Sequence, residues 1–504
     1  MDSHTSETDM PEILSHQGAL QKSLAAGQWF LIDTIAQKIL IFGAFFVTAR
    51  LLTPADFGLI ALATIYPGLL DSLTAVAFET AITQKKSGGE KTYLDVVWTF
   101  NLIRMTVLFC FIFFTAPLVA HFFHANDTIL LFRVSGLILF FQGWTNIGQI
   151  YFFRDLNFKK IFIRDMVNYG TTAVVSVIGA LLLHSYWALF IGNATGILAT
   201  TIATYFLSDH RPHIDAQFKK LKPLMAYSQW VFGQGIISRL VQTTEDTLMG
   251  HFASTTSIGL YGKAKTLART PTSPLGNIIG KIGFSALVKV QDSTEHIREG
   301  FHKSFDLTAS IALPFLVAIF IAGDQLIRII LGASWEGIIP FIKLLTIVAT
   351  LDAFGVTIGG FIFNALDKPK LVIRLNILAL ASMIILLPIL IPSRGAFGAA
   401  VALLITSIIT NVYAFVLINR VVRPNFSRIR DVLGITGLSL LFPSLIVSYL
   451  LRFPFTHSVF AFTLLCIGGG ISYGCALILS GVALKRGPYK TLHIIGRSFI
   501  RKHK

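Results

Sequence analysis

The sequence predicts an all-α, polytopic membrane protein with about 14 transmembrane helices. Only 13% of the 504 residues are charged, whereas soluble domains carry about 25%. The mean hydropathy is +0.69. Apolar runs of the roughly 20 residues that a helix needs to cross a bilayer recur along the whole chain. No stretch between them is long enough for a soluble domain, so the chain is expected to lie almost entirely within the membrane.

Short polar breaks divide the apolar sequence into segments that can each span the hydrocarbon core. The predicted spans, in chain order, are 24–51, 55–84, 95–120, 128–152, 161–183, 187–207, 224–250, 259–285, 304–328, 338–366, 372–392, 397–419, 433–451 and 458–484. Prolines lie at the edges of several spans, for example Pro54 and Pro223. A proline costs least there, because the first helical N–H groups have no partner within the helix.

Lys and Arg residues are concentrated on one side of the predicted membrane. Of the 42 Lys and Arg residues, 29 lie at the termini and in or beside the loops that follow even-numbered spans, 5 lie on the opposite side and 8 lie within spans. Because cytoplasmic loops carry the excess of Lys and Arg, both termini are predicted to be cytoplasmic. The same asymmetry accounts for most of the formal charge of +16, so nucleic acid is not expected as a partner.

Two stretches of the first half recur in the second half at similar offsets. Residues 152–164, after the fourth span, match 362–374, after the tenth, and residues 56–64 match 257–267. Repeated halves are common in transporters. Since the offset covers an even number of spans, the two copies are predicted to be parallel lobes of six helices each.

The repeat and the loops together predict six regions. They are a cytoplasmic N-terminal segment 1–22, an N-lobe 23–207, a cytoplasmic inter-lobe linker 208–223, a C-lobe 224–420, two further spans within 421–484, and a basic cytoplasmic tail 485–504.

No catalytic or metal-binding motif is recognisable. The three cysteines, Cys110, Cys466 and Cys475, all lie in apolar segments. His121 and His124 have an H-x-x-H spacing, as do His210 and His213, but neither pair has a further ligand beside it. The sequence contains no Gly-rich phosphate loop after a strand and no nucleophile elbow. We therefore expect no catalytic residue, no cofactor and no metal.

Several stretches resemble bacterial polysaccharide flippases of the Wzx type. The sequence ARLLTPADFGLIALATIYPGLLDSL (49–73), followed by ETAITQKK (79–86), is similar to the first-hairpin signature of these proteins. Residues 245–271 resemble the start of their second lobe, and 186–196 their sixth helix. The resemblance covers most of 24–425 and is strongest to the colanic-acid and exopolysaccharide subgroup of the multidrug/oligosaccharidyl-lipid/polysaccharide exporter superfamily, which includes the O-antigen flippases.

This resemblance implies two six-helix lobes around a central cavity plus two C-terminal helices. It implies a substrate made of an oligosaccharide repeat unit on polyprenyl pyrophosphate, moved across the bacterial inner membrane by alternating access for exopolysaccharide or lipopolysaccharide biosynthesis. No cofactor is implied. Membrane lipids are expected partners, and a polysaccharide polymerase and the export machinery are open as further ones.

Four cations within predicted spans are candidates for contact with the pyrophosphate. They are Arg104, Arg239, Arg269 and Lys38. A charge at the centre of the bilayer costs roughly 2.5–3.5 kcal/mol on insertion scales, so it should face a wet cavity or a charged partner. Arginine is favoured because its paired donors match phosphate oxygens. An ion pair between Arg239 and Asp246, which share one helical stripe, is the competing interpretation.

Four acids within predicted spans are candidates for coupling a proton or cation gradient to transport. They are Asp33, Asp71, Asp246 and Asp352. Intramembrane carboxylates commonly take up ions or form ion pairs with buried Lys or Arg. Both interpretations are open from the sequence.

Three other functions compete with a lipid-linked oligosaccharide flippase. A cation-coupled exporter of small molecules on the same scaffold would favour an acidic cavity, against which the excess of buried cations argues. A membrane-bound polymerase or ligase would carry a large outer loop with catalytic residues, whereas the outer loops here are short. A lipid-scaffold protein would tolerate neutralisation of all three arginines.

Overall fold

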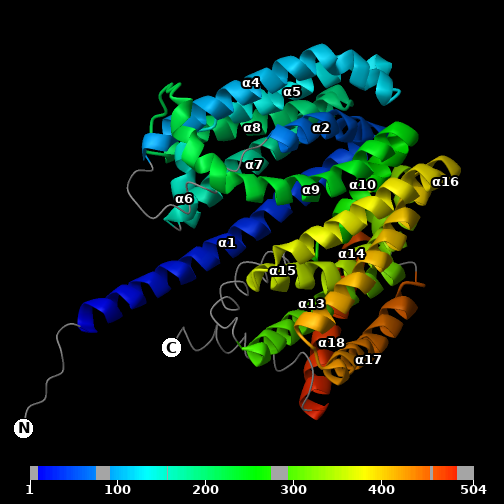
Figure 1. Ribbon diagram of the computed structural model, residues 1–504. Helices are drawn as coiled ribbons and strands as arrows, with labels where there is room; N and C mark the ends of the chain where they lie inside the picture. The colour runs from blue at the N-terminus through cyan, green and yellow to red at the C-terminus, as the bar shows by residue number, and fades with distance from the viewer. Residues whose placement is uncertain (1–8, 75–90, 156, 274–292, 454–457, 485–504) are drawn as a thin grey trace, which may run out of the picture. The chain divides into compact units, whose positions relative to one another are not determined.

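The computed structural model describes residues 9–74, 91–155, 157–273, 293–453 and 458–484 (Figure 1). Within these ranges the chain is helical and contains no strand. Ten of the described helices are long and apolar enough to cross a membrane. The prediction of an all-α, multi-pass membrane protein is therefore confirmed. The chain forms two compact units: unit 1 comprises 1–52 and 62–236, and unit 2 comprises 53–61 and 237–504.

The helices of unit 1 lie close to the predicted spans. In chain order the elements are α1 (Asp9–Leu51), α2 (Pro54–Thr74), α4 (Lys91–Phe122), η1 (Asn126–Thr128), α5 (Ile129–Gly143), η2 (Ile147–Gln149), α6 (Ile150–Arg154), α7 (Phe158–Leu183), α8 (Trp187–Leu207), η3 (Phe218–Leu221) and α9 (Lys222–Phe252). Helices α2 and α9 each have residues in both units. The second half of the predicted span 55–84 lies outside the described residues from position 75.

The predicted span 128–152 is not one continuous helix. Helix α5 ends at Gly143, and a 3₁₀ turn and the short α6 follow it. The break is held by Asn146, which is fully buried. Its backbone N–H donates to Thr204 Oγ1 (3.1 Å), and its side-chain oxygen accepts from Gly148 N (2.8 Å). These contacts satisfy the groups that the helix end leaves free, which is why the break is stable.

Unit 2 contains the remaining helices. They are α10 (Thr255–Arg269), α13 (Thr294–Ile330), η5 (Ala333–Ile338), α14 (Ile339–Asp352), the π-helical turn η6 (Ala353–Thr357), α15 (Ile358–Ala365), α16 (Pro369–Val421), α17 (Phe426–Leu450) and α18 (Val459–Leu484). Its main apolar core is formed by α13, α15, α16 and α17, with Phe301 and Phe363 fully buried. The second part of the predicted span 259–285 lies outside the described residues from position 274.

Helix α16 combines two predicted spans, 372–392 and 397–419. The chain bends at Gly395, whose φ of 59° and ψ of −146° are not helical. A positive φ is accessible to glycine at little cost. A side chain on Gly398 would overlap the carbonyl oxygen of Leu390, so this tight bend also needs the second glycine. The two predicted spans are therefore present and meet at a sharp bend.

The hairpins α1–α2 and α9–α10 occupy equivalent positions in the sequence repeat. The offset that relates 56–64 to 257–267 also relates the end of α1 at Leu51 to the end of α9 at Phe252. The next helices begin with matching caps. Asp56 N donates to Thr53 Oγ1 (3.4 Å), and Ser257 N donates to Ser254 Oγ (3.3 Å). An N-terminal hydroxyl of this kind satisfies a free N–H of the first turn.

The first turns of α2 and α10 cross at two glycines within unit 2. A side chain added to Gly58 would overlap the carbonyl oxygen of Thr255, and one added to Gly259 would overlap that of Pro54. Small residues allow helix backbones in membranes to approach this closely. Gly58 and Gly259 match each other in the repeat, so its two copies meet at this crossing.

Candidate functional site

Arg104 on α4 is bound by side chains of α2 and by one of its own helix. Its Nη1 atom lies 2.8 Å from Asp71 Oδ1 and donates to Thr74 Oγ1 (2.9 Å) of α2, and its Nη2 atom donates to Asn101 Oδ1 (3.0 Å) of α4. The Arg104 side chain is only 13% exposed. Thus one predicted substrate cation and one predicted coupling acid bind each other, and their charges offset one another locally.

Asp33 on α1 belongs to a half-neutralised acidic group in unit 1. The amide of Gln37 donates to Asp33 Oδ2 (2.7 Å) and to Asp165 Oδ2 (3.1 Å) on α7. Arg164 binds Asp165 Oδ1 at 2.7 Å. Asp33 is 6% exposed, and its Oδ1 atom has no hydrogen-bond partner among the described residues. Arg164 thus binds Asp165, and the Gln37 amide links Asp165 to Asp33. Among the described residues the buried Asp33 Oδ1 is unsatisfied, which is costly in a membrane.

Lys265 on α10 joins the two adjacent acids of α9 in unit 2. Its Nζ atom lies 2.9 Å from Glu245 Oε2 and 3.0 Å from Asp246 Oδ1. Glu245 is 2% exposed and also accepts a hydrogen bond from Tyr261 Oη (2.7 Å). The partner of Asp246 is therefore Lys265, whereas the sequence analysis weighed Arg239 as its partner. One ammonium thus bridges a buried carboxylate, that of Glu245, and a partly exposed one, that of Asp246, whose side chain is 46% exposed.

Asp352, the last residue of α14, lies beside the π-helical turn η6. Its Oδ1 atom accepts hydrogen bonds from Ser407 Oγ (2.6 Å) and Asn411 Nδ2 (3.0 Å) of α16. Asn411 Oδ1 in turn accepts from Val356 N (3.1 Å) within the π turn. Such turns contain an extra residue and free a backbone group. The Asp352 carboxylate therefore takes part in fixing the turn, and no basic side chain contacts it among the described residues.

Three of the predicted cations have no bonded acidic partner in the part of the chain that the structure describes. Arg239 on α9 and Arg269 on α10 are exposed, and Lys38 on α1 is half-buried. None of the three forms an ion pair with a described acid, whereas Arg104 and Lys265 do. Arg269, however, interacts electrostatically with Glu245, Asp246 and Asp352. Lys38 and Arg239, for which the described residues supply no acidic partner, can attract an anion from outside.

Lys38 and Arg239 are equivalent in the sequence repeat. Helices α1 and α9 end at Leu51 and Phe252, which match each other, and Lys38 and Arg239 lie the same number of residues before these ends. Each copy of the first hairpin helix therefore carries one cation without a described acidic partner at the same distance from the end of its own helix.

The sequence analysis missed the roles of Lys265 and Asp165. Lys265 could have been found by counting from the turn between α9 and α10. Tyr261 and Glu245 are equally far from this turn, and Lys265 lies four residues after Tyr261, on the same face of α10. The contact of Asp165 with Gln37 joins helices that are distant in sequence, and the sequence contains no local signal for it. In the described ranges no group of three or more His, Cys, Asp or Glu side chains could hold a metal ion.

Comparison with known proteins identifies a family. Residues 47–340 match the family model described as "Polysaccharide biosynthesis protein". The chain is 23% identical over 450 residues to the lipopolysaccharide biosynthesis protein WzxC of Escherichia coli (strain K12). The matched residues cover 86% of this chain and 88% of that protein.

Solved structures share the fold. The chain superposes on the lipid II flippase MurJ in an inward closed conformation with a TM-score of 0.71, at 17% identity, over 91% of this chain and 99% of that one. An inward-facing multidrug resistance MATE family transporter of the MOP superfamily gives a TM-score of 0.60, at 14% identity, over 77% and 96% of the two chains. At these identities the likeness shows the transporter fold alone.

Proposed function

The chain belongs to the polysaccharide biosynthesis protein family, and we propose that it is a flippase for polyprenyl-pyrophosphate-linked oligosaccharide repeat units. The family match covers more than half of the chain, and the relative in Escherichia coli is named for lipopolysaccharide biosynthesis. The fold is that of membrane transporters. The proposed location is the bacterial inner membrane with both termini in the cytoplasm, as the distribution of Lys and Arg predicts.

The observation that carries the substrate class is the repeated cation. Lys38 and Arg239 occupy equivalent positions, and neither has an acidic partner among the described residues. A pyrophosphate presents concentrated negative charge, which a guanidinium binds through paired donors. Arg269, on the same hairpin as Arg239, is a weaker candidate, because it interacts electrostatically with Glu245, Asp246 and Asp352. Arg104 is the weakest of the four candidates, because Asp71 already binds it.

The coupling ion is proposed to bind at Asp33. Among the four candidate acids, Asp71 and Asp246 contact a basic side chain, and Asp352 accepts two hydrogen bonds. Among the described residues, the group of Asp33, Gln37, Arg164 and Asp165 instead holds two carboxylates and one guanidinium, and Asp33 Oδ1 is buried and unsatisfied there. A proton or a monovalent cation would neutralise this excess. Its uptake and release could drive alternating access of the two six-helix lobes predicted within 23–207 and 224–420.

The sidedness of lipid-linked oligosaccharide tests the proposal. Spheroplasts of a deletion strain are treated with a lectin or glycosidase that reaches only the outer leaflet, with wild-type protein, Arg239→Ala or Arg430→Ala restored. Arg430 is a matched control, because its side chain is 82% exposed and lies in α17, away from the α9–α10 hairpin. The expected result is accumulation on the inner leaflet, cleared by wild type and Arg430→Ala but not by Arg239→Ala.

Unchanged sidedness and polymer output after deletion, in a strain without a second flippase, would overturn the proposal. Gradient-driven export of small organic cations in that case would favour the alternative, a cation-coupled multidrug exporter. Equal clearance by Arg239→Ala and wild type would leave flipping in place and remove Arg239 from the substrate path.

A further inference from the structure

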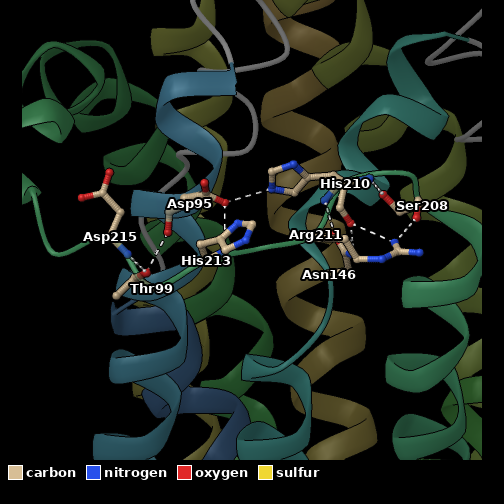
Figure 2. A network of polar contacts seen from close by, with 9 residues as sticks. Asp95, Thr99, Asn146, Ser208, His210, Arg211, His213 and Asp215 are labelled. Carbon is tan, nitrogen blue, oxygen red and sulfur yellow. Dashed lines mark hydrogen bonds and ion pairs between the residues drawn. The ribbon is translucent and has the colours of Figure 1, made fainter.

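The connection between α8 and α9 is fixed to unit 1 by side chains of α4. We call residues 208–222 the connecting strap. Asp95 and Thr99, one turn apart on α4, hold its middle part (Figure 2). Asp95 Oδ1 lies 3.0 Å from His210 Nε2 and accepts from His213 N (3.2 Å), and Thr99 Oγ1 accepts from Asp215 N (2.9 Å).

The beginning of the strap is held from the break between α5 and α6. Asn146 Nδ2 donates to the carbonyl oxygen of His210 (2.8 Å). A side chain on Gly148 would overlap Ser208 Oγ, so the backbones approach closely here. The Arg211 guanidinium donates to the carbonyl oxygens of Ser208 and His210 (Figure 2). Although the strap has no regular secondary structure before η3, its backbone is well determined by these contacts.

Neighbouring side chains place the strap at the depth of lipid headgroups. On α8, Ile202 is 51% exposed and Phe206 is 83% exposed, so this helix presents apolar side chains to lipid almost to its last residue, Leu207. Tyr205 Oη donates to the carbonyl oxygen of Trp144, whose own side chain is 43% exposed. Tyr and Trp are enriched at membrane–water interfaces. The strap begins one residue after α8 ends, so it lies at this interface.

The outward side of the strap combines apolar and basic side chains. Ile214 is 78% exposed and Phe218 is 41% exposed. Arg211, Lys219 and Lys222 are exposed as well. A loop that exposes a large aliphatic side chain among cations, next to the acyl region, matches the composition of interfacial membrane anchors.

The acids of the strap neutralise only part of its charge. Asp215 lies 2.8 Å from the Lys220 ammonium. This hydrogen bond, followed by one from Gln217 N, holds the pKa of the Asp215 carboxyl below its usual range, so the pair is ionised and internally balanced. Asp209 is the other acid of the strap. The three exposed cations therefore exceed the one remaining acid.

We propose that the connecting strap is a binding site for anionic phospholipid headgroups. Arg211 and Lys219 bind the headgroup phosphates, while Ile214 and Phe218 enter the acyl boundary beside Phe206. The contacts from Asp95, Thr99 and Asn146 hold the strap ready in the bound conformation, which lowers the entropic cost of binding. Because the strap continues directly into α9, a bound headgroup would also fix the start of that helix. This site is independent of the proposed transport function.

Lipid retention by the purified full-length protein tests this site. Native mass spectrometry in a mild detergent would count phosphatidylglycerol and phosphatidylcholine molecules bound to wild type and to Arg211→Gln/Lys219→Gln. Each cation near an anionic surface contributes about 1 kcal/mol, so the double variant should bind phosphatidylglycerol about 30-fold more weakly. Lys303→Gln/Arg430→Gln is the matched control, because it removes two exposed cations from unit 2.

Two results would overturn the proposal. One is equal retention of phosphatidylglycerol by the double variant and the control, and the other is equal retention of the two lipids by wild type. A photo-crosslinking residue at position 214 gives a second readout that does not depend on the stability of the variants. Adducts with the mass of a phospholipid support the site, whereas adducts only to another protein would assign the strap to a protein partner instead.

Discussion

The hairpins α1–α2 and α9–α10 are copies of one element, yet they differ in charge. Each contains a hydroxyl that caps its second helix, Thr53 or Ser254, and a glycine at the helix crossing, Gly58 or Gly259. Where the second copy has Glu245, Asp246 and Lys265, the first has Ala44, Phe45 and Thr64. The contacts that bring the backbones together are therefore common to both copies, whereas the Glu245–Asp246–Lys265 group occurs in only one. Backbone approach and charge placement can be varied separately in this fold.

Removal of the Lys265 ammonium should have the largest effect on the stability of the α9–α10 hairpin. Lys265→Ala should lower the free energy of unfolding by about 3–5 kcal/mol, because it leaves Glu245 buried with an uncompensated charge. Unfolding in detergent micelles titrated with sodium dodecyl sulfate measures this change. Glu245→Gln in the same chain should restore part of the loss. An equal loss in the single and double variants would mean that the ion group does not cause it.

Replacement of either crossing glycine should lower the free energy of unfolding by a similar amount. Gly58→Ala and Gly259→Ala each place a methyl group on a carbonyl oxygen of the other helix, and overpacking of this kind costs about 1–3 kcal/mol. Gly262→Ala, on the same helix as Gly259, has no neighbouring atom within 4 Å of the new Cβ and should be neutral or stabilising. The same unfolding titration compares the three. A strongly unequal cost at the two crossing glycines would contradict the equivalence.

Asp33 lies in the hairpin that has no counterpart of the Glu245–Asp246–Lys265 group, and its replacement should have a small effect on stability. Asp33→Asn removes a charge that is not fully balanced, so the free energy of unfolding should fall by less than about 0.5 kcal/mol or rise. Asp71→Asn, which leaves Arg104 without its carboxylate, should destabilise more. Transport into proteoliposomes driven by a proton or sodium gradient should be lost in Asp33→Asn. Gradient-driven transport at the wild-type rate would exclude Asp33 as the coupling site.

Replacement of Lys38 or Arg239, the cations at equivalent positions of the repeat, should have the smallest effect on the free energy of unfolding. Lys38→Gln and Arg239→Gln should each change the free energy of unfolding by no more than about 0.5 kcal/mol, since neither side chain binds a described acid. Flipping should slow about tenfold or more, because a hydrogen bond to a charged group contributes roughly 1.5–3 kcal/mol. Unfolding and flipping are measured on the same preparations. A loss of stability without a loss of flipping would make these residues structural.

Most of the helices could be predicted from the sequence, because a helix needs about 20 apolar residues to cross a bilayer and runs of this length are recognisable in the sequence. It was insufficient for the break at Asn146. That break depends on Thr204 and His210, which approach Asn146 only in the folded unit.

The same limit applies to the candidate site. The types and depths of Arg239 and Asp33 could be read from the sequence, but their partners could not. Arg239 was the cation within helical reach of Asp246, and the choice of Lys265 instead follows from how α10 packs against α9. Asp165 was not considered, because its link to Asp33 passes through the amide of Gln37 on another helix.

The crossing of α2 and α10 at Gly58 and Gly259 resembles the two-fold interface of a homodimer. Gly58 faces the carbonyl of Thr255 while Gly259 faces that of Pro54, which is the reciprocal pattern of an isologous, two-fold interface. In a homodimer every substitution appears on both sides of such an interface. With both halves in one polypeptide, the self-complementary backbone contact can remain while Thr64 and Lys265 differ. Covalent linkage thus lets a symmetric scaffold carry an asymmetric distribution of charge.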